Sequence, residues 1–169
     1  MKTIGFLLII FSSLSLGVNH VASRKERIDT LLSFAAMLEL IKAELNSNLC
    51  SIPELLERIA LKIDGPALNF IKVLKLNFSV LGEKSFSAIW EESLAVCNAA
   101  LAENEFDSIR SLGNVLGKYT LETQSRALDE CISLLRQSEK NASFDFPQMK
   151  RLSLGVSVSA GLLLGILLI

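Results

Sequence analysis

The sequence predicts an all-α membrane protein, a helical bundle of about six helices between an N-terminal and a C-terminal transmembrane helix. Half of the 169 residues are hydrophobic, and the longest uncharged stretches lie at the two ends of the chain. Between the ends, apolar residues recur at spacings of three and four, and no segment shows sustained alternation. The predicted divisions are a first transmembrane helix at 3–22, a bundle at 23–149 and a second transmembrane helix at 150–169.

The first hydrophobic segment, Thr3–Val18, contains no charged residue. As a helix it is about 24 Å long, slightly short of a hydrocarbon core of roughly 30 Å, and continuation through Ala22 reaches the interface. The alternative is a cleaved signal peptide, because Lys2 precedes the apolar stretch and Val21 and Ser23 could flank a cleavage site. The chain would then be an exported, tail-anchored helical binding protein.

The second hydrophobic segment, Leu152–Ile169, is also uncharged and forms about 27 Å of helix. Basic residues flank the inner ends of both segments: Arg24, Lys25, Arg27, Lys150 and Arg151. Only Lys2 lies on the other side of the first segment. The positive-inside rule therefore places the bundle in the cytoplasm.

Small residues recur in both predicted transmembrane helices. Four of them repeat every four residues in the second helix, and two more form a shorter series in the first: Ser153, Ser157, Gly161, Gly165, Ser13 and Gly17. We expect them to form a face on which another helix packs closely, although glycine is in any case common in membrane helices. The partner of this face, the other span or another subunit, is left open.

The first bundle helix is expected from about Lys25 to Asn48, continuing the first membrane helix without a break because no Gly or Pro interrupts it. The second begins at Ser51, where Ser51 and Glu54 fit a capping box. Glu54 and Arg58 fit an i,i+4 ion pair, and the Asp-Gly-Pro sequence at 64–66 is expected to end the helix.

A third helix is expected from about Ala67 to Leu81, and a fourth is capped by Ser85 or Ser87. Trp90 lies in the fourth at helical spacing from other apolar residues, which favours a core position over a ligand or partner contact.

A short fifth helix ends near Gly117, and a sixth runs from its N-cap Thr120 to about Lys140. Pro147 disfavours helical geometry at the residue before it, so a kink or short loop is expected over Asn141–Pro147.

The residues that could support catalysis or bind a metal are scarce. The single histidine, His20, has no acidic residue within five positions, so no catalytic triad is expected. Cys50, Cys97 and Cys131 are far apart and form no CxxC pair, which predicts buried thiols and no zinc site. We therefore expect no enzymatic activity, no metal and no cofactor.

Charges are balanced along the chain, with 17 basic and 18 acidic residues, which argues against a nucleic-acid partner. Adjacent acidic residues are expected on solvated helix faces: Glu91 with Glu92, Glu103 with Glu105, and Asp129 with Glu130. Four charged residues near helix starts are candidates for a protein-docking surface, although they could simply face solvent: Glu44, Glu54, Arg58 and Glu91.

Several short motifs resemble, in order and spacing, the stage III sporulation protein AB family. They are Glu44 with Leu45, Ser51-Ile52-Pro53-Glu54-Leu55-Leu56-Glu57-Arg58-Ile59-Ala60, Ala88-Ile89-Trp90-Glu91-Glu92-Ser93-Leu94, Leu112-Gly113, Leu116-Gly117 and Gln124. Together with the hydrophobic helix at each end, the resemblance covers nearly the whole chain.

The resemblance implies a two-pass protein of the mother-cell membrane that faces the forespore, in the channel complex of endospore-forming bacteria. It also implies a soluble part similar to the cytoplasmic domain of type II secretion and type IV pilus platform proteins. Expected partners are the membrane and other stage III sporulation channel proteins, including a secretion-type ATPase. A homo-oligomer is a further option, and no catalytic residue carries over.

Overall fold

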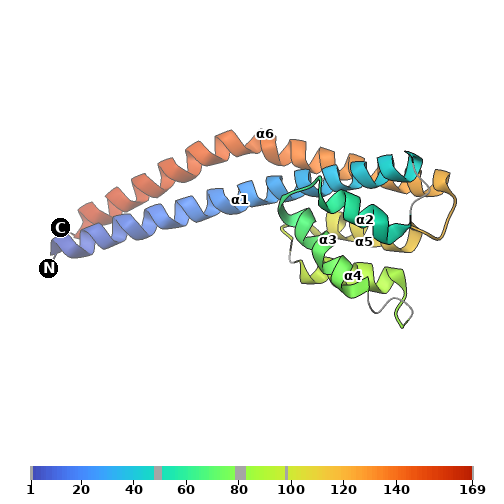
Figure 1. Ribbon diagram of the computed structural model, residues 1–169. Helices are drawn as coiled ribbons and strands as arrows, with labels where there is room; N and C mark the ends of the chain where they lie inside the picture. Colours follow the sequence, from blue (N-terminus) through green and yellow to red (C-terminus); the bar gives the residue numbers. More distant parts are fainter. Residues whose placement is uncertain (1, 48–50, 79–82, 98, 169) are drawn as a thin grey trace. The chain divides into compact units, whose positions relative to one another are not determined.

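The computed structural model describes the backbone of residues 2–47, 51–78, 83–97 and 99–168, and the side chains of residues 22–47, 51–78, 83–97 and 99–144. Its elements are six helices: α1 (Lys2–Ser47), α2 (Ile52–Ala60), α3 (Gly65–Asn77), α4 (Phe86–Val96), α5 (Glu103–Val115) and α6 (Leu121–Leu168) (Figure 1). The prediction of an all-α chain is confirmed for these residues.

The chain divides into two compact units. One contains Met1–Glu26 and Asn141–Ile169, and the other contains Arg27–Lys140. Across the residues that the structure describes, no helix is both long enough and apolar enough to cross a membrane. The predicted packing residues lie outside the described side chains: Ser13, Gly17, Ser153, Ser157, Gly161 and Gly165.

The unit Arg27–Lys140 is a bundle in which successive short helices pack on one another, α2 on α3, α3 on α4 and α4 on α5. Ion pairs join the parts of α1 and α6 that belong to this unit. Lys42 Nζ lies 2.6 Å from Asp129 Oδ1, and Arg136 Nη2 lies 2.9 Å from Glu39 Oε1. These pairs are partly exposed, so each contributes at most about 1 kcal/mol, and the bundle depends mainly on its apolar core.

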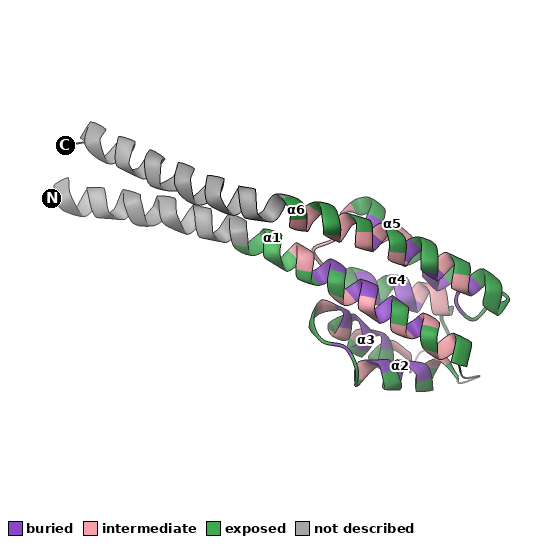
Figure 2. Cartoon of the chain, turned by 90° about the horizontal axis from the view of Figure 1, so that it is seen from above, coloured by how far each residue is buried: buried purple, intermediate pink, exposed green. Residues whose placement is uncertain are grey.

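The core of this unit contains residues from every helix, and Figure 2 shows buried positions interleaved with exposed ones along the helices. The fully buried apolar residues of α1 recur at helical spacing: Leu31, Phe34, Ala35, Met37, Leu38 and Ile41. These residues form the inner face of the helix.

Two of the predicted helix caps form and one does not. Ser85 Oγ accepts a hydrogen bond of 3.3 Å from the Ala88 amide, and Thr120 Oγ1 accepts one of 3.4 Å from the Thr123 amide. Ser51 is the N-cap of α2, but its side chain makes no capping hydrogen bond. The predicted capping box is therefore wrong, because the Glu54 carboxylate accepts from Arg58 Nη2 at 2.8 Å.

The Asp-Gly-Pro sequence at 64–66 begins a helix, contrary to the expectation that it ends one. α2 already ends at Ala60, and Asp64 is the N-cap residue of α3. Ser33 of α1 holds this start, since its Oγ donates to Asp64 O at 2.7 Å and accepts from the Ala67 amide at 3.1 Å. The cap that α3 needs comes from a residue distant in sequence, which a local motif cannot reveal.

Of the kink or short loop expected over Asn141–Pro147, the loop is wrong, because α6 is helical from Leu121 to Leu168. A proline inside a helix removes one backbone hydrogen bond and costs about 3 kcal/mol, but it need not end the helix. A helix of this length has many other hydrogen bonds to offset the loss. The continuity of α1 from Lys2 to Ser47 agrees with the prediction.

Candidate functional site

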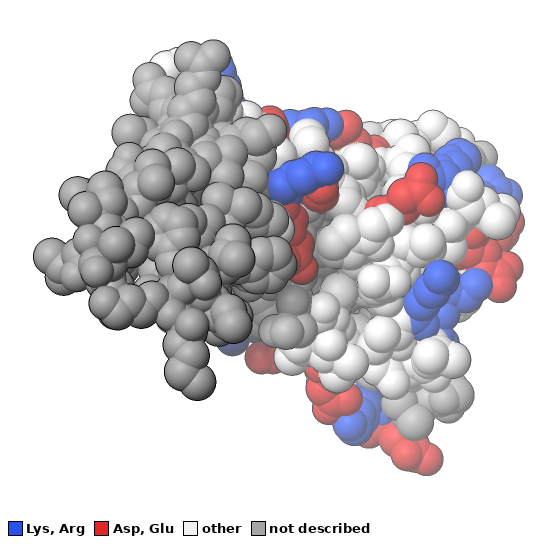
Figure 3. Space-filling model, turned by 90° about the vertical axis from the view of Figure 1, so that its left-hand side faces the viewer, with Lys and Arg blue, Asp and Glu red and all other residues white. Residues whose placement is uncertain are grey.

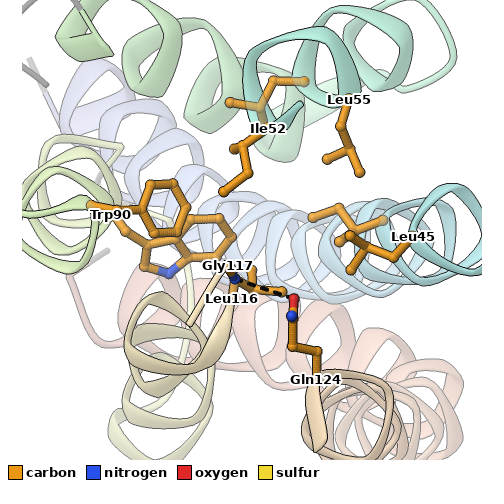
Figure 4. Close-up of a pocket in the computed structure, with 10 residues that line it drawn as sticks. Leu45, Ile52, Leu55, Trp90, Leu116, Gly117 and Gln124 are labelled. Atoms are coloured by element: carbon orange, nitrogen blue, oxygen red, sulfur yellow. Dashed lines mark hydrogen bonds between the residues drawn. The ribbon is translucent and has the colours of Figure 1, made fainter. Parts of the chain in front are cut away.

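An apolar pocket lies among the helices of the bundle (Figure 4). Its volume is about 150 Å³. Residues of α1, α2, α4 and α6 and of the segment after α5 line it: Ile41, Leu45, Ile52, Leu55, Leu56, Phe86, Trp90, Leu116, Gly117 and Gln124. We call it the Trp90 pocket. Nine of these residues present only carbon-rich side chains or backbone, so the pocket is suited to apolar groups.

Gly117 and Gln124 line the pocket where α5 turns into α6. Gly117 has a φ of +75°, and a Cβ atom there would lie 2.9 Å from Ile52 Cδ1. The Gln124 side-chain oxygen accepts from the Gly117 amide at 3.2 Å (Figure 4), and its nitrogen donates to Tyr119 O at 2.6 Å. The oxygen and the nitrogen of the Gln124 amide, the one side-chain amide at the pocket, are therefore both hydrogen-bonded to backbone groups.

Trp90 forms one wall of the pocket and is 1% exposed. Its Nε1 donates to Ile109 O of α5 at 2.9 Å, and its ring meets Phe70 edge-on with 4.8 Å between centroids. Gly113 of α5 lies against the indole. The prediction that Trp90 is a core residue is confirmed, and its contacts hold α3, α4 and α5 together.

Replacing Gly113 by alanine is expected to lower the free energy of unfolding by about 1–3 kcal/mol. A Cβ atom there would lie 2.8 Å from Trp90 Cδ1 and Cγ, far inside the roughly 3.5–4.0 Å of normal carbon contact. The measurement is denaturant unfolding of the full chain followed by circular dichroism. Asn114→Ala is the matched control, because Asn114 is exposed in the same turn of α5. An unchanged midpoint for Gly113→Ala would contradict the close Trp90 contact.

Three of the four predicted docking residues meet on one side of α2. Arg58 Nη2 lies 2.8 Å from Glu54 Oε1, as predicted, and Arg58 Nη1 lies 3.5 Å from Glu44 Oε2. Lys62 Nζ joins them, 2.9 Å from Glu44 Oε1. We call Glu44, Glu54, Arg58 and Lys62 the α2 charge cluster. Because Glu44 and Glu54 each neighbour a pocket residue, Leu45 and Leu55, the cluster lies beside the Trp90 pocket.

Glu91, the fourth predicted residue, is not part of this cluster and lies 3.5 Å from Arg110 Nη1 of α5. Figure 3 shows basic and acidic side chains intermingled on the face that it presents. Glu91, Glu92, Asp129 and Glu130 are exposed, as predicted for acidic neighbours.

Glu105 contradicts the prediction of a solvated face, because it is 1% exposed. One carboxylate oxygen accepts from Arg27 Nη2 at 2.7 Å, and the other accepts from the Ala102 amide at 2.7 Å. The second bond caps the start of α5, and the first ties that start to α1. The position of Glu105, three residues after the N-cap, is a local signal for its capping role. Its partner Arg27 is 78 residues away, so the sequence does not reveal the ion pair.

The two described cysteines lie away from any metal-binding arrangement. Cys97 is half-buried and Cys131 is buried, and Cys50 lies outside the described residues. Burial raises the pKa of both thiols, so both are protonated at neutral pH. In the part of the chain described here, no group of three or more His, Cys, Asp and Glu residues could hold a metal ion.

Comparison with known proteins identifies the family. The segments that carry the sequence resemblance meet at the Trp90 pocket, which Ile52, Leu55, Trp90, Gly117 and Gln124 all line. The sequence model of "Stage III sporulation protein AB (spore_III_AB)" matches residues 2–169. The chain belongs to the stage III sporulation protein AB family. Membership assigns it to sporulation.

A solved structure supports the same fold. A chain described as "Stage III sporulation protein AB (SpoIIIAB)" superposes with a TM-score of 0.63 at 20% sequence identity. The match covers 71% of the present chain and 95% of the solved one. Among curated proteins, none matches. The family is therefore known from the sequence model, and the solved structure adds that the helical fold is shared.

Proposed function

We propose that this chain is a non-enzymatic platform subunit of the channel complex between mother cell and forespore. In this proposal it is anchored in the mother-cell membrane by hydrophobic helices at 3–22 and 150–169, with the helical bundle in the cytoplasm. The bundle binds other stage III sporulation proteins, including a secretion-type ATPase, and the α2 charge cluster is part of the docking surface.

The residues that line the Trp90 pocket support the proposal that the chain is not an enzyme. A catalytic site needs an acid, a base or a nucleophile within reach of its substrate. The pocket is lined by apolar groups and one amide, and Gln124 is already bonded to Gly117 and Tyr119. Such a site favours binding of apolar groups over chemical transformation of a substrate.

The membrane part of the proposal is supported by charge. Uncharged segments at both ends adjoin basic residues only on their inner sides, apart from Lys2, which favours a cytoplasmic bundle. Arg24 and Lys25 are exposed in the structure, as expected for residues at a membrane surface. The exported alternative requires cleavage near Ser23.

Deletion of the gene in its spore-forming host is expected to block development after engulfment and to abolish heat-resistant spores. The wild-type chain supplied in trans should restore the spore count. Normal spore counts without the chain would refute the proposed role in the channel complex.

Topology is tested in intact cells with Ser23→Cys and Lys150→Cys in a chain whose three native cysteines are replaced by serine. A membrane-permeant maleimide should label both positions, and an impermeant one should label neither. Labelling by the impermeant reagent, or a mature mass lacking the residues before Ser23, would support the exported alternative instead.

A further inference from the structure

The residues that line the Trp90 pocket range from fully buried to exposed. Leu45, Ile52 and Phe86 are half-buried and Gly117 is exposed, whereas Leu56 and Trp90 close the inner end. Figure 4 shows the side chains of Leu45, Ile52, Leu55 and Trp90 arranged around the space. A group entering past the half-buried residues would contact the face of a protein core.

The volume of the pocket limits what can occupy it. At about 150 Å³, it matches an apolar cavity that takes up one benzene molecule. Sites for cofactors and drug-sized ligands are about 300–1,000 Å³. The occupant is therefore no larger than one ring or one branched aliphatic side chain.

The charged residues next to the pocket indicate which charge the partner protein carries beside the bound side chain. Lys118 directly follows the exposed pocket residue Gly117 in sequence, is itself exposed, and pairs with no carboxylate in the part of the chain that the structure describes. The α2 charge cluster lies at the α2 side, where Arg58 already neutralises Glu54. The available charge beside Gly117 is positive, so a negative group on the partner is favoured there.

We propose that the Trp90 pocket binds one leucine- or phenylalanine-sized side chain of a partner protein, with an acidic residue beside it that pairs with Lys118. An apolar pocket with a charged residue beside it is the arrangement that anchors protein interfaces. The pocket has no free polar group to orient a small polar ligand, which favours a side chain held by its own backbone. This inference rests on the proposed function and names the chemistry of its partner.

The first test asks whether the pocket admits one ring. Trp90 is the only tryptophan of the chain, so its fluorescence reports on this pocket alone. Bromobenzene, added to the full chain in lipid nanodiscs, is expected to quench that fluorescence saturably, because heavy-atom quenching requires contact. Leu45→Phe and Leu55→Phe should remove the saturable quenching by filling the pocket, and Leu76→Phe, at an exposed site on α3, should retain it.

The second test asks whether sporulation needs the pocket. Leu45→Phe and Leu55→Phe are expected to lower heat-resistant spore counts by about tenfold or more, as loss of an interface anchor would. Leu45→Met, which conserves volume, and Leu76→Phe should leave the count unchanged. Lys118→Glu should lower it severalfold, whereas Lys72→Glu, at another exposed lysine, should not. Two filling variants are used so that one still decides if the other fails to accumulate.

The outcomes separate this inference from the proposed function. Normal spore counts in both pocket-filling variants, or quenching that survives filling, would overturn the pocket inference even if deletion abolishes spores. A photo-crosslinking amino acid, benzophenone-alanine, in place of Lys118 identifies the protein that binds at the pocket in cells. A crosslink to a different protein that disappears in Leu45→Phe supports the inference when the spore count also falls, and a crosslink only to a second copy of this chain overturns it.

Discussion

Trp90→Ala is expected to lower the free energy of unfolding of the bundle by about 3–5 kcal/mol. The substitution removes the largest fully buried side chain, its edge-on contact with Phe70 and its hydrogen bond to Ile109 O. The space left by the indole also joins the existing pocket of about 150 Å³, so the surrounding helices cannot relax enough to fill the combined cavity. No other single substitution of an apolar residue should cost this bundle more.

Guanidinium unfolding of the full chain, followed by circular dichroism at 222 nm, measures this effect without needing tryptophan fluorescence. Trp90→Phe is the matched control, because it keeps one ring and removes the indole hydrogen bond. It should cost less than Trp90→Ala, with about 0.5–1.5 kcal/mol of its loss from the missing indole hydrogen bond to Ile109 O. A loss below about 1 kcal/mol for Trp90→Ala would contradict its role as the centre of the core.

Glu105→Ala is expected to cost about 3 kcal/mol. Glu105 is 1% exposed, and its loss leaves the guanidinium of Arg27, which is 28% exposed, without its carboxylate partner. The cap on the Ala102 amide disappears at the same time, so the start of α5 loses a side-chain acceptor. Because Arg27 is partly solvated, the cost lies at the lower end of the range for a broken buried pair.

Glu103→Ala is the matched control for this prediction, since Glu103 is an exposed acid in the same first turn of α5. It should change stability by less than about 0.5 kcal/mol. A double-mutant cycle of Glu105→Ala with Arg27→Met separates the ion pair from the cap, and a coupling energy above about 1 kcal/mol is expected. Equal effects of Glu103→Ala and Glu105→Ala would show that the buried pair adds nothing.

The local helical features could be predicted because they depend on residues close together in sequence. The cap at Ser85, the Glu54–Arg58 pair and the core position of Trp90 each follow from spacings of three or four residues. The predicted docking residues Glu44 and Arg58 lie close together for a different reason, since the packing of α1 and α2 sets that distance.

Two of the wrong predictions share a physical cause. Glu105 is buried because Arg27 reaches it from another helix, and the Asp-Gly-Pro sequence at 64–66 starts α3 because Ser33 of α1 binds Asp64 O and the Ala67 amide. In both cases the hydrogen-bond partner lies on another helix, so the neighbouring sequence does not reveal it. The Trp90 pocket could not be predicted for the same reason, because its walls come from five separated segments.

The sequence by itself determined the helical class, the spacing of the apolar faces, the uncharged ends and the family to which the chain belongs. The tertiary structure alone decided which charges are buried, where α3 begins and which motif residues share one pocket. The reason is that helix periodicity and capping act over a few residues of chain. Burial and pocket shape depend instead on how whole helices pack, and that packing joins residues up to 97 positions apart.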